Sequence, residues 1–340
     1  MTVTIAIPTY NREHELKVLL DEILIQAQEV PSASFNVLVS DNASTDGTER
    51  MVESMRQRFA EFSIELVYVR NNSNLGFSRN VINAIENSSG EFVLIMGDDD
   101  SLELHTLGFL NDTIPIYTDA DLFFLKPIEY SSDLYRRTTS LSVENSCETL
   151  VYDDGIKYIH LKKGYPPALI SGYIVRKSAW LSCNARDFSY SMCVHMLVAT
   201  RLLLRHAMAV EIMRPCIKYR GGQQNTTWSH DELYPFRFYL DLLMATKIMK
   251  SEMDSRTLKI LEWLSLRTIA FYLLRQKVVE HPFSETKFRD YYRTALCRHS
   301  LYSFMIMMIQ LTPGFLIRMF LGHWIRALNA KTGFYWKGEK

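Results

Sequence analysis

Carboxylate side chains follow two apolar, β-branched runs of the sequence at the point where each run ends. Asp41 comes directly after FNVLVS, and Asp98, Asp99 and Asp100 come directly after FVLIMG. Adjacent carboxylates repel one another unless a cation neutralises them, and Mg²⁺ and Mn²⁺ prefer carboxylate and phosphate oxygens. The pattern therefore indicates a divalent-ion site, and the alternative is a solvated acidic turn.

These carboxylates belong to a stretch in which strand and helix patterns alternate. Short β-branched runs and helically spaced apolar residues predict strands at 3–8, 35–40, 64–70 and 92–96 and helices at 13–28, 45–59 and 77–87. This alternation is typical of an α/β fold with a mostly parallel sheet and helices on both faces. Ligands bind such sheets beyond the carboxyl ends of the strands. We therefore expect the ligand loops to be 9–12, 41–46, 71–76 and 97–101.

The later sequence is less regular. β-like pieces stand at 150–152 and 156–160, and a strand is predicted at 171–176. A helix over 190–205 precedes a strand over 209–219. These elements continue the α/β pattern of the first half.

The pattern changes to purely helical at about residue 231. We therefore expect one α/β domain over residues 1–230, with a first half at 1–130 and a second half at 131–230. Residues 231–340 are expected to form a helical C-terminal region. The first half is expected to bind the main ligand and the second half its reaction partner.

Four motifs of the first half, IAIPTYNRE, SDNASTDGT, NNSNLGFSRN and GDDD, occur in that order. Their order and spacing resemble the nucleotide-binding half of the family-two inverting glycosyltransferases of the GT-A fold. SGYIVRKSAW, SYSMCVHM and YRGGQQNTTW further resemble bacterial O-antigen sugar transferases of the abequosyltransferase-like kind. The resemblance implies transfer of a sugar from a nucleoside diphosphate-sugar, with UDP favoured by analogy, to a hydroxyl.

The resemblance also implies which residues hold the donor. Asp41 would accept a hydrogen bond from the base, and Gly76 would let the backbone approach the ligand closely. Residues around the polar loop after the strand at 209–219, among them Tyr219 and Asn225, could close over the diphosphate. The implied donor-binding residues are Pro8, Thr9, Tyr10, Asn11, Asp41, Asn74, Gly76, Arg79, Asp98, Asp99 and Arg220.

A metal cofactor follows from the same resemblance. Asp98 and Asp100 match the outer carboxylates of the DxD motif, of which the first faces the ribose or sugar and the last ligates the ion. We expect Mn²⁺ or Mg²⁺ at Asp100 and Asp98. The ion would bridge the diphosphate and stabilise the charge that develops as the nucleoside diphosphate leaves.

The family usually supplies a general base as the Asp of a Glu-Asp pair, with an Arg six residues later. Here Val194 and His195 occupy the pair position, and Arg201 lies six residues after His195. An imidazole with a pKa near 6.5 can accept a proton at neutral pH. His195 is therefore the predicted catalytic base, with Asp187 as the alternative.

The charge of the chain is unevenly distributed. The formal net charge is zero, but residues 241–340 carry 16 Lys/Arg and 8 Asp/Glu. These charges are interleaved with apolar residues, which fits an anionic membrane surface better than nucleic acid. The uncharged stretch 300–317 fits interfacial helices, a spanning helix or a buried contact. We expect a peripheral protein on the cytoplasmic face of the membrane, acting on a lipid-linked glycan such as an O-antigen or capsule repeat unit.

Further features exclude other classes of protein. Five cysteines without a CxxC pair argue against a disulfide framework and a cysteine zinc site. The opening MTVTIAIPTYNRE lacks the features of a signal peptide. Two alternative functions remain, a non-catalytic nucleotide-sugar or glycan-binding subunit and a sugar nucleotidyltransferase. The loop PTYNRE argues against the latter, because that class has a Gly-rich, Lys/Arg-containing loop after its first strand.

Overall fold

The computed structural model describes residues 2–28, 30, 34–131, 133–134, 137–138, 149–221 and 236–279, together with Phe288, Tyr292, Ile306 and Ile309. The chain divides into two compact units, Met1–Gln224 and Asn225–Lys340.

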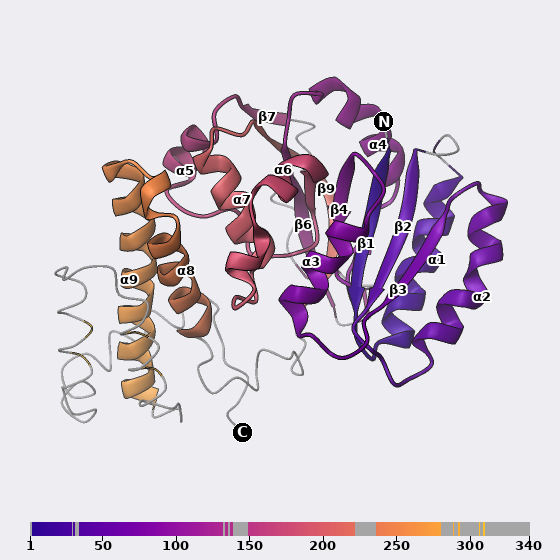
Figure 1. Cartoon of the computed structure of the whole chain (residues 1–340), viewed down its shortest axis with the longest axis horizontal. Helices are drawn as coiled ribbons and strands as arrows, with labels where there is room; N and C mark the ends of the chain where they lie inside the picture. Colours follow the sequence, from indigo (N-terminus) through magenta and orange to yellow (C-terminus); the bar gives the residue numbers. More distant parts are fainter. Residues whose placement is uncertain are drawn as a thin grey trace. The chain divides into compact units, whose positions relative to one another are not determined.

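The first half of unit one has the predicted alternation of strands and helices. In chain order its elements are β1 (Val3–Thr9), α1 (Glu13–Ala27), β2 (Phe35–Asp41), α2 (Thr48–Glu61), β3 (Leu66–Arg70), α3 (Phe77–Asn87) and β4 (Phe92–Ile95). β1 and β2 are buried along their whole length, as parallel strands covered on both faces are. α1 and α2 pack together on one face of the sheet, and α3 covers the other. There α3 meets two later helices, α6 (Lys177–Ser182) and α7 (Val194–Leu204) (Figure 1).

The second half of unit one adds shorter elements. They are β5 (Ser101–Leu102), α4 (Thr106–Thr113), η1 (Ile114–Tyr117), β6 (Leu122–Tyr130), β7 (Thr149–Tyr152), α5 (Gly155–Lys162), β8 (Tyr173–Arg176), α6 (Lys177–Ser182), η2 (Ala185–Phe188), α7 (Val194–Leu204) and β9 (Ala209–Arg220). Within this part of the chain, Cys183, Cys193 and Cys216 are buried.

All these strands form one sheet in the order β3-β2-β1-β4-β8-β6-β9-β5, with β7 paired to β9. β1 to β4 are parallel, but β8 runs antiparallel to both β4 and β6, and β5 and β7 run antiparallel to β9. The predicted α/β fold with parallel strands is thus confirmed, and the antiparallel strands β5, β7 and β8 make the sheet mixed. The periodicity of a strand reports its burial and not its direction, so the sequence could not reveal this.

The strand order reverses at β1. From β1 the chain moves outward to β2 and β3, and α3 then returns it to β4 on the other side of β1. The carboxyl ends of β1 and β4 therefore form the topological switch point of the sheet, where ligands of open α/β folds bind. The triplet from Asp98 to Asp100 follows β4 at this place.

Three local predictions differ from the structure. Residues 156–160 are not β-like but belong to α5, because the Asp154 side chain accepts a hydrogen bond from the Ile156 amide, 2.9 Å away, and caps the helix. α2 begins at Thr48 rather than near residue 45, since Asp46 accepts hydrogen bonds from the Thr48 amide and hydroxyl. α7 begins only at Val194 and not at 190.

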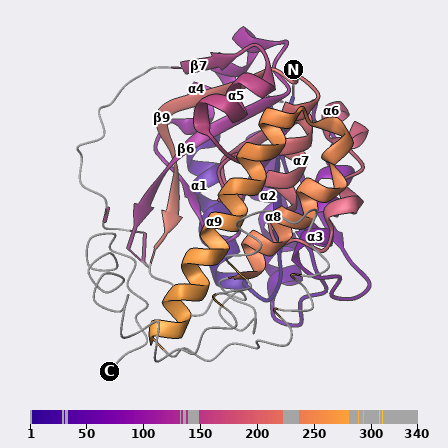
Figure 2. The same cartoon turned by 90° about the vertical axis from the view of Figure 1, so that its left-hand side faces the viewer.

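Unit two contains α8 (Phe236–Ile248), η3 (Lys250–Glu252) and α9 (Ser255–Val279). Leu240 and Leu243 of α8 pack with Leu266, Ile269 and Leu273 of α9 in a common core, and both helices are seen side by side in Figure 2. Among the helices that the structure describes, none has the length and apolar character required to cross a membrane. Apart from Ile306 and Ile309, the stretch 300–317 lies outside the described residues.

Candidate active site

The predicted ligand loops are tied together at the carboxyl edge of the parallel strands. Thr9, the last residue of β1, donates a hydrogen bond from Oγ1 to Asp98 Oδ2 at 2.8 Å, and its carbonyl accepts from the Asn42 amide at 2.9 Å. The Asn71 amide in turn donates to the carbonyl of Asp41 at 2.8 Å. Residues from all four loops therefore lie at one edge of the sheet.

The aspartate triplet is buried at its two ends. Asp98 and Asp100 are each 7% exposed, while Asp99 is half-buried. Burial, as the largest cause, and the neighbouring charge of Asp99 together raise the pKa of both Asp98 and Asp100 to about 7. Both carboxyl groups therefore favour a cation or a proton at neutral pH.

Arg12 supplies a cation that the sequence analysis did not assign. Its Nη1 lies 3.1 Å from Asp98 Oδ1 and 2.5 Å from Asp99 Oδ2, and it lowers the pKa of Asp98 against the effect of burial. Arg12 stands in the loop PTYNRE, between β1 and α1. One feature of the sequence could have identified Arg12. It is a basic residue in one strand-end loop, and its charge complements the three acidic residues in another.

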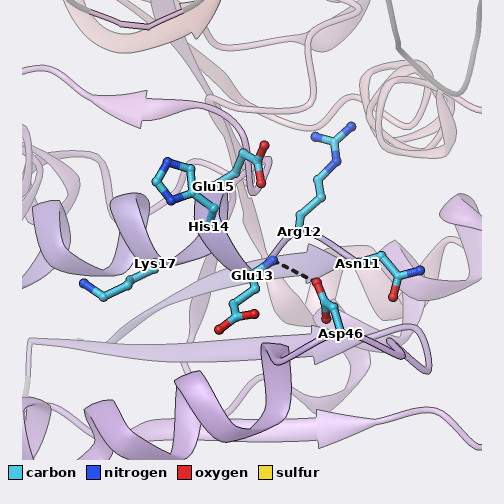
Figure 3. Close-up of a pocket in the computed structure, with 7 residues that line it drawn as sticks. All are labelled: Asn11, Arg12, Glu13, His14, Glu15, Lys17 and Asp46. Atoms are coloured by element: carbon cyan, nitrogen blue, oxygen red, sulfur yellow. Dashed lines mark hydrogen bonds between the residues drawn. The ribbon is translucent and has the colours of Figure 1, made fainter.

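Arg12 also borders a cavity of about 390 Å³ at the start of α1. In Figure 3 the guanidinium of Arg12 extends away from Asp46, whose Oδ2 accepts a hydrogen bond from the Glu13 amide. The cavity carries both signs of charge, and its lining residues are Asn11, Arg12, Glu13, His14, Glu15, Lys17 and Asp46.

The Asp100 carboxylate accepts two hydrogen bonds, one at each oxygen. Ser171 Oγ donates to Asp100 Oδ2 at 2.5 Å and accepts from the Gly97 amide at 2.8 Å. The Arg220 amide donates to Asp100 Oδ1 at 3.2 Å, and Arg220 Nε donates to the Asp99 carbonyl at 3.0 Å. Predicted donor-binding residue Arg220 therefore lies against the triplet, and Ser171 is a second site residue that the sequence analysis missed.

Asp41 lies at the end of β2 but is enclosed by the chain itself. Its exposed fraction is 0%, and Oδ1 accepts from the Ser44 amide and hydroxyl. Oδ2 accepts from the Tyr68 hydroxyl at 2.5 Å and lies 3.5 Å from Arg70 Nε. In this arrangement Asp41 fastens the loop after β2, and a nucleobase would reach it only if these contacts moved.

Other predicted donor-binding residues line the surface of the same edge. Tyr10 is 42% exposed, and Asn11 adopts a φ of 52° while its Oδ1 accepts from the Thr45 amide at 2.7 Å. Asn74 Oδ1 accepts from both Asn42 Nδ2 and the Gly76 amide. Pro8 is buried within β1.

Gly76 and Arg79 begin α3 on this edge. Gly76 has a φ of 83°, a conformation that other residues rarely adopt, and nothing lies within 4 Å of an added Cβ. The glycine is therefore required for the backbone turn into α3. Arg79, in the first turn of α3, is exposed to solvent.

His195, the predicted base, lies inside the protein. It is 1% exposed, its Nε2 is 2.9 Å from the Ala168 carbonyl, and its ring packs edge-on against Tyr173. Burial, opposed by the Ala168 contact, lowers its pKa to about 4. An acceptor hydroxyl cannot reach an enclosed imidazole, so this placement favours a structural role for His195 over the predicted one.

Asp187, the alternative base, is exposed but engaged. It accepts hydrogen bonds from Asn184 Nδ2 at 2.7 Å and from Arg201 Nη1 at 2.8 Å. Its neighbour Arg186 pairs with Glu86 near the C-terminal end of α3, whereas Ser191 meets Ser78 in the first turn of that helix. Asp187 therefore lies toward the end of α3 that is remote from the strand-end loops.

Two further residues named from the sequence are Tyr219 and Asn225. Tyr219 is half-buried on β9. Burial and the contact with Glu129 raise the pKa of Tyr219 to about 12. Asn225 lies outside the described residues.

The carboxylate oxygens of the triplet suit a divalent ion whose coordination is completed by a bound ligand. Within the described part of the chain, no three His, Cys, Asp or Glu side chains converge as a ready-made metal site. Mg²⁺ and Mn²⁺ in phosphate-handling sites commonly take one or two carboxylates, with the remaining oxygens from phosphates and water. Two buried carboxyl groups with raised pKa values, Asp98 and Asp100, meet that requirement.

Comparisons with known proteins agree with this geometry. Residues 4–110 match the profile of Glycosyl transferase family 2. Abequosyltransferase RfbV of Salmonella typhimurium is 31% identical over 198 residues, 56% of this chain and 56% of that protein. A Campylobacter jejuni GalNAc(5)-diNAcBac-PP-undecaprenol beta-1,3-glucosyltransferase is 28% identical over 100 residues, 29% of this chain and 30% of that protein. The chain thus spans about half of the first relative's length and less than a third of the second's.

A solved structure extends the likeness to the fold. TarS 1-349 of Staphylococcus aureus in complex with UDP-GlcNAc superposes with a TM-score of 0.63 at 18% identity, covering 99% of this chain and 93% of that one. The matched profile ends at residue 110, so it includes β1 to β4, the strand-end loops and the triplet. The chain therefore shares the GT-A-like fold of TarS, and its residues 4–110 are similar to glycosyl transferase family 2.

Proposed function

We propose that this protein transfers one sugar from a nucleoside diphosphate-sugar to a hydroxyl of a glycan. The observation that carries the proposal is the acidic triplet at the switch point of the sheet, inside the segment that matches the family. The Thr9–Asp98 hydrogen bond joins the ends of β1 and β4 at that place. A concentration of buried carboxyl groups there suits a ligand whose phosphates bring a cation with them.

On the donor side, the chain's residues bind and orient the nucleotide. Tyr10 and Asn11 present exposed side chains beside the triplet, and the exposed guanidinium of Arg79 is available to a phosphate. UDP is the favoured nucleotide, because the relative TarS is described in complex with UDP-GlcNAc. Asp41 contributes indirectly, because its hydrogen bonds to Ser44 hold the loop after β2 in place.

A divalent ion is the proposed cofactor. Asp98 and Asp100 would hold Mn²⁺ or Mg²⁺ together with the donor's phosphates. The ion supplies stabilisation of the negative charge that develops on the leaving diphosphate. Arg12 contacts Asp98 and Asp99, and Arg220 contacts Asp99 and Asp100. Both arginines therefore restrict how the carboxylates of the triplet move.

The stereochemistry and the base rest on the family resemblance. Inversion at the anomeric carbon requires a group that takes the proton of the attacking hydroxyl. Of the two predicted bases, Asp187 retains solvent access and His195 does not. NMR of the anomeric configuration in donor and product tests the inversion directly.

The proposed acceptor is a lipid-linked glycan such as an O-antigen or capsule repeat unit. The relative whose name includes PP-undecaprenol supports a lipid carrier. The excess of basic residues over 241–340 supports contact with an anionic membrane surface on the cytoplasmic side. Sedimentation of the full chain with anionic vesicles, reversed by salt, tests this contact, and equal sedimentation with neutral vesicles would contradict it.

The first experiment is a thermal-shift screen. The protein is heated with UDP, GDP, CDP and dTDP and their common sugars, with and without Mn²⁺. A ligand at 100 times its Kd stabilises by about 2.7 kcal/mol, so we expect a clear shift with one nucleotide that Mn²⁺ increases.

Two variants make the screen specific. Asp100→Ala is expected to abolish the Mn²⁺-dependent part of the shift, and Asp119→Ala, at an exposed turn, is the matched control. Binding without donor hydrolysis or transfer would favour the alternative of a non-catalytic binding subunit. No shift with any nucleotide would contradict the proposal.

A further inference from the structure

His195 makes one directed polar contact from inside the core. Its Nε2 lies 2.9 Å from the carbonyl oxygen of Ala168, and because a carbonyl only accepts, Nε2 carries the proton. Its Nδ1 is buried without a hydrogen-bond partner among the described residues. His195 is therefore a neutral imidazole that donates to the backbone of residue 168.

The segment that receives this hydrogen bond is held at several points. The Tyr173 hydroxyl donates to the Pro167 carbonyl, and the Tyr173 ring meets the His195 ring at a centroid distance of 5.0 Å. Gly172 has a φ of 100°, and its carbonyl accepts from the Leu125 amide at 2.9 Å. These contacts shape residues 167–173 into a fixed turn before β8.

Ser171 stands in this turn and faces the triplet. It is 2% exposed, and its Oγ both donates to Asp100 Oδ2 and accepts from the Gly97 amide. A hydroxyl that bridges these two groups fixes the Asp100 carboxylate relative to the backbone of the turn after β4. A continuous series of contacts thus leads from α7 through residues 168–171 to Asp100.

We propose that His195 is a positioning residue, whose Nε2–H holds residues 168–171 so that Ser171 orients Asp100 toward the divalent ion and the donor's diphosphate. This inference rests on the proposed function. It gives the nitrogen donor at this position a role, since His195 Nε2–H donates to the Ala168 carbonyl. It also separates His195 from the proton transfer for which the sequence suggested it.

Two substitutions at residue 195 distinguish positioning from base catalysis. Gln carries an amide Nε2–H with a reach similar to that of the imidazole Nε2, but it does not titrate and cannot accept the proton. Phe preserves the ring and its packing against Tyr173 but lacks the donor. Each variant is assayed for kcat, KM for the donor, the pH profile and the affinity for Mn²⁺ in the presence of the nucleoside diphosphate.

Positioning predicts that the two variants differ. His195→Gln should keep kcat within about threefold of the wild type with an unchanged pH profile, because the donor to Ala168 remains. His195→Phe and Ser171→Ala should each weaken Mn²⁺ binding by about tenfold, as supporting contacts to metal ligands typically do.

Opposite results would overturn the inference. If Gln and Phe both lower kcat by about 10²-fold or more while Mn²⁺ affinity is unchanged, His195 is the base. If Phe binds Mn²⁺ as tightly as the wild type, the hydrogen bond to Ala168 orients nothing. Should His195→Phe fail to fold, Ser171→Ala decides, and wild-type Mn²⁺ affinity in that variant contradicts the proposal.

The wild-type protein separates this inference from the proposed function. A wild type that binds no nucleoside diphosphate with Mn²⁺ would remove the proposed function and this inference together. A wild type that binds and transfers, with variants that bind equally well, would remove the inference alone.

Discussion

The ends of β2 and β4 carry the same kind of residue at equivalent places in the sheet, yet the chain treats them differently. Asp41 after β2 accepts hydrogen bonds from Ser44 and Tyr68 and is completely enclosed. Asp98 and Asp100 after β4 are nearly as buried, but burial outweighs their partners and raises their pKa values. Asp98 accepts hydrogen bonds from Thr9 and Arg12, and Asp100 accepts them from Ser171 and the Arg220 amide.

This difference separates a scaffold carboxylate from ligand-binding ones. A buried charge that is fully hydrogen-bonded stabilises the fold, whereas one that is incompletely compensated destabilises it until a cation arrives. The end of β2 therefore builds the loop beside the proposed site, and we propose that the residues after β4 recognise the ligand. Removing each charge in turn tests this contrast.

The largest expected effect is on activity at the end of β4. We expect Asp100→Asn to lower kcat by about 10²–10³-fold, because it removes a charge that holds the ion against the leaving diphosphate. The variant should be as stable as the wild type or more so, since it also removes a poorly compensated buried charge. Activity and thermal denaturation are measured together, and a large loss of stability would break the contrast.

The matching substitution at the end of β2 should lower the stability of the fold rather than the activity. We expect Asp41→Asn to lower the free energy of unfolding by about 2–3 kcal/mol, because the Ser44 and Tyr68 donors would lose a charged acceptor. Urea denaturation measures this change, with Asp119→Asn as the exposed control. A variant of normal stability that no longer binds nucleotide would instead assign Asp41 to the base, as the family resemblance implies.

The pH dependence of stability sharpens the same comparison. Asp98 and Asp100 have pKa values of about 7 in the folded protein, above their ordinary value of 3.8. The folded state therefore binds more protons between about pH 4 and pH 7, and the free energy of unfolding falls as the pH rises through that window. Denaturation at several pH values checks the sign, and Asp100→Asn should reduce the slope. A rise in stability over this window would contradict the prediction.

The smallest effect is expected at Asp187. Its carboxylate pairs with the buried Arg201 but is 36% exposed itself, so Asp187→Asn should cost only about 1 kcal/mol of stability. If Asp187 is the base, kcat should also fall by about 10²-fold or more with donor binding unchanged. Normal kcat in a folded variant would exclude it from proton transfer.

The sequence predicted the parallel half of the sheet well because that half is built from local signals. Continuous β-branched runs and helical apolar spacing reproduced β1 to β4 and α1 to α3, and α3 was predicted with its observed bounds, Phe77–Asn87. β6, which contains Pro127, was not predicted. Its place beside β8 depends on pairing between residues about fifty positions apart, which no local pattern records.

Residue types and spacing alone identified the acidic triplet, the four strand-end loops and the family resemblance. The loops could be placed together because the carboxyl ends of the strands in βαβ units meet at one edge of the sheet, independently of side-chain packing. Only the tertiary structure decided which carboxyl groups have pKa values raised by burial. It brought Arg12 from the loop after β1, Arg220 from β9 and Ser171 from the turn before β8 to the triplet. It also enclosed His195 in the core, since burial and hydrogen-bond partners depend on contacts between distant segments.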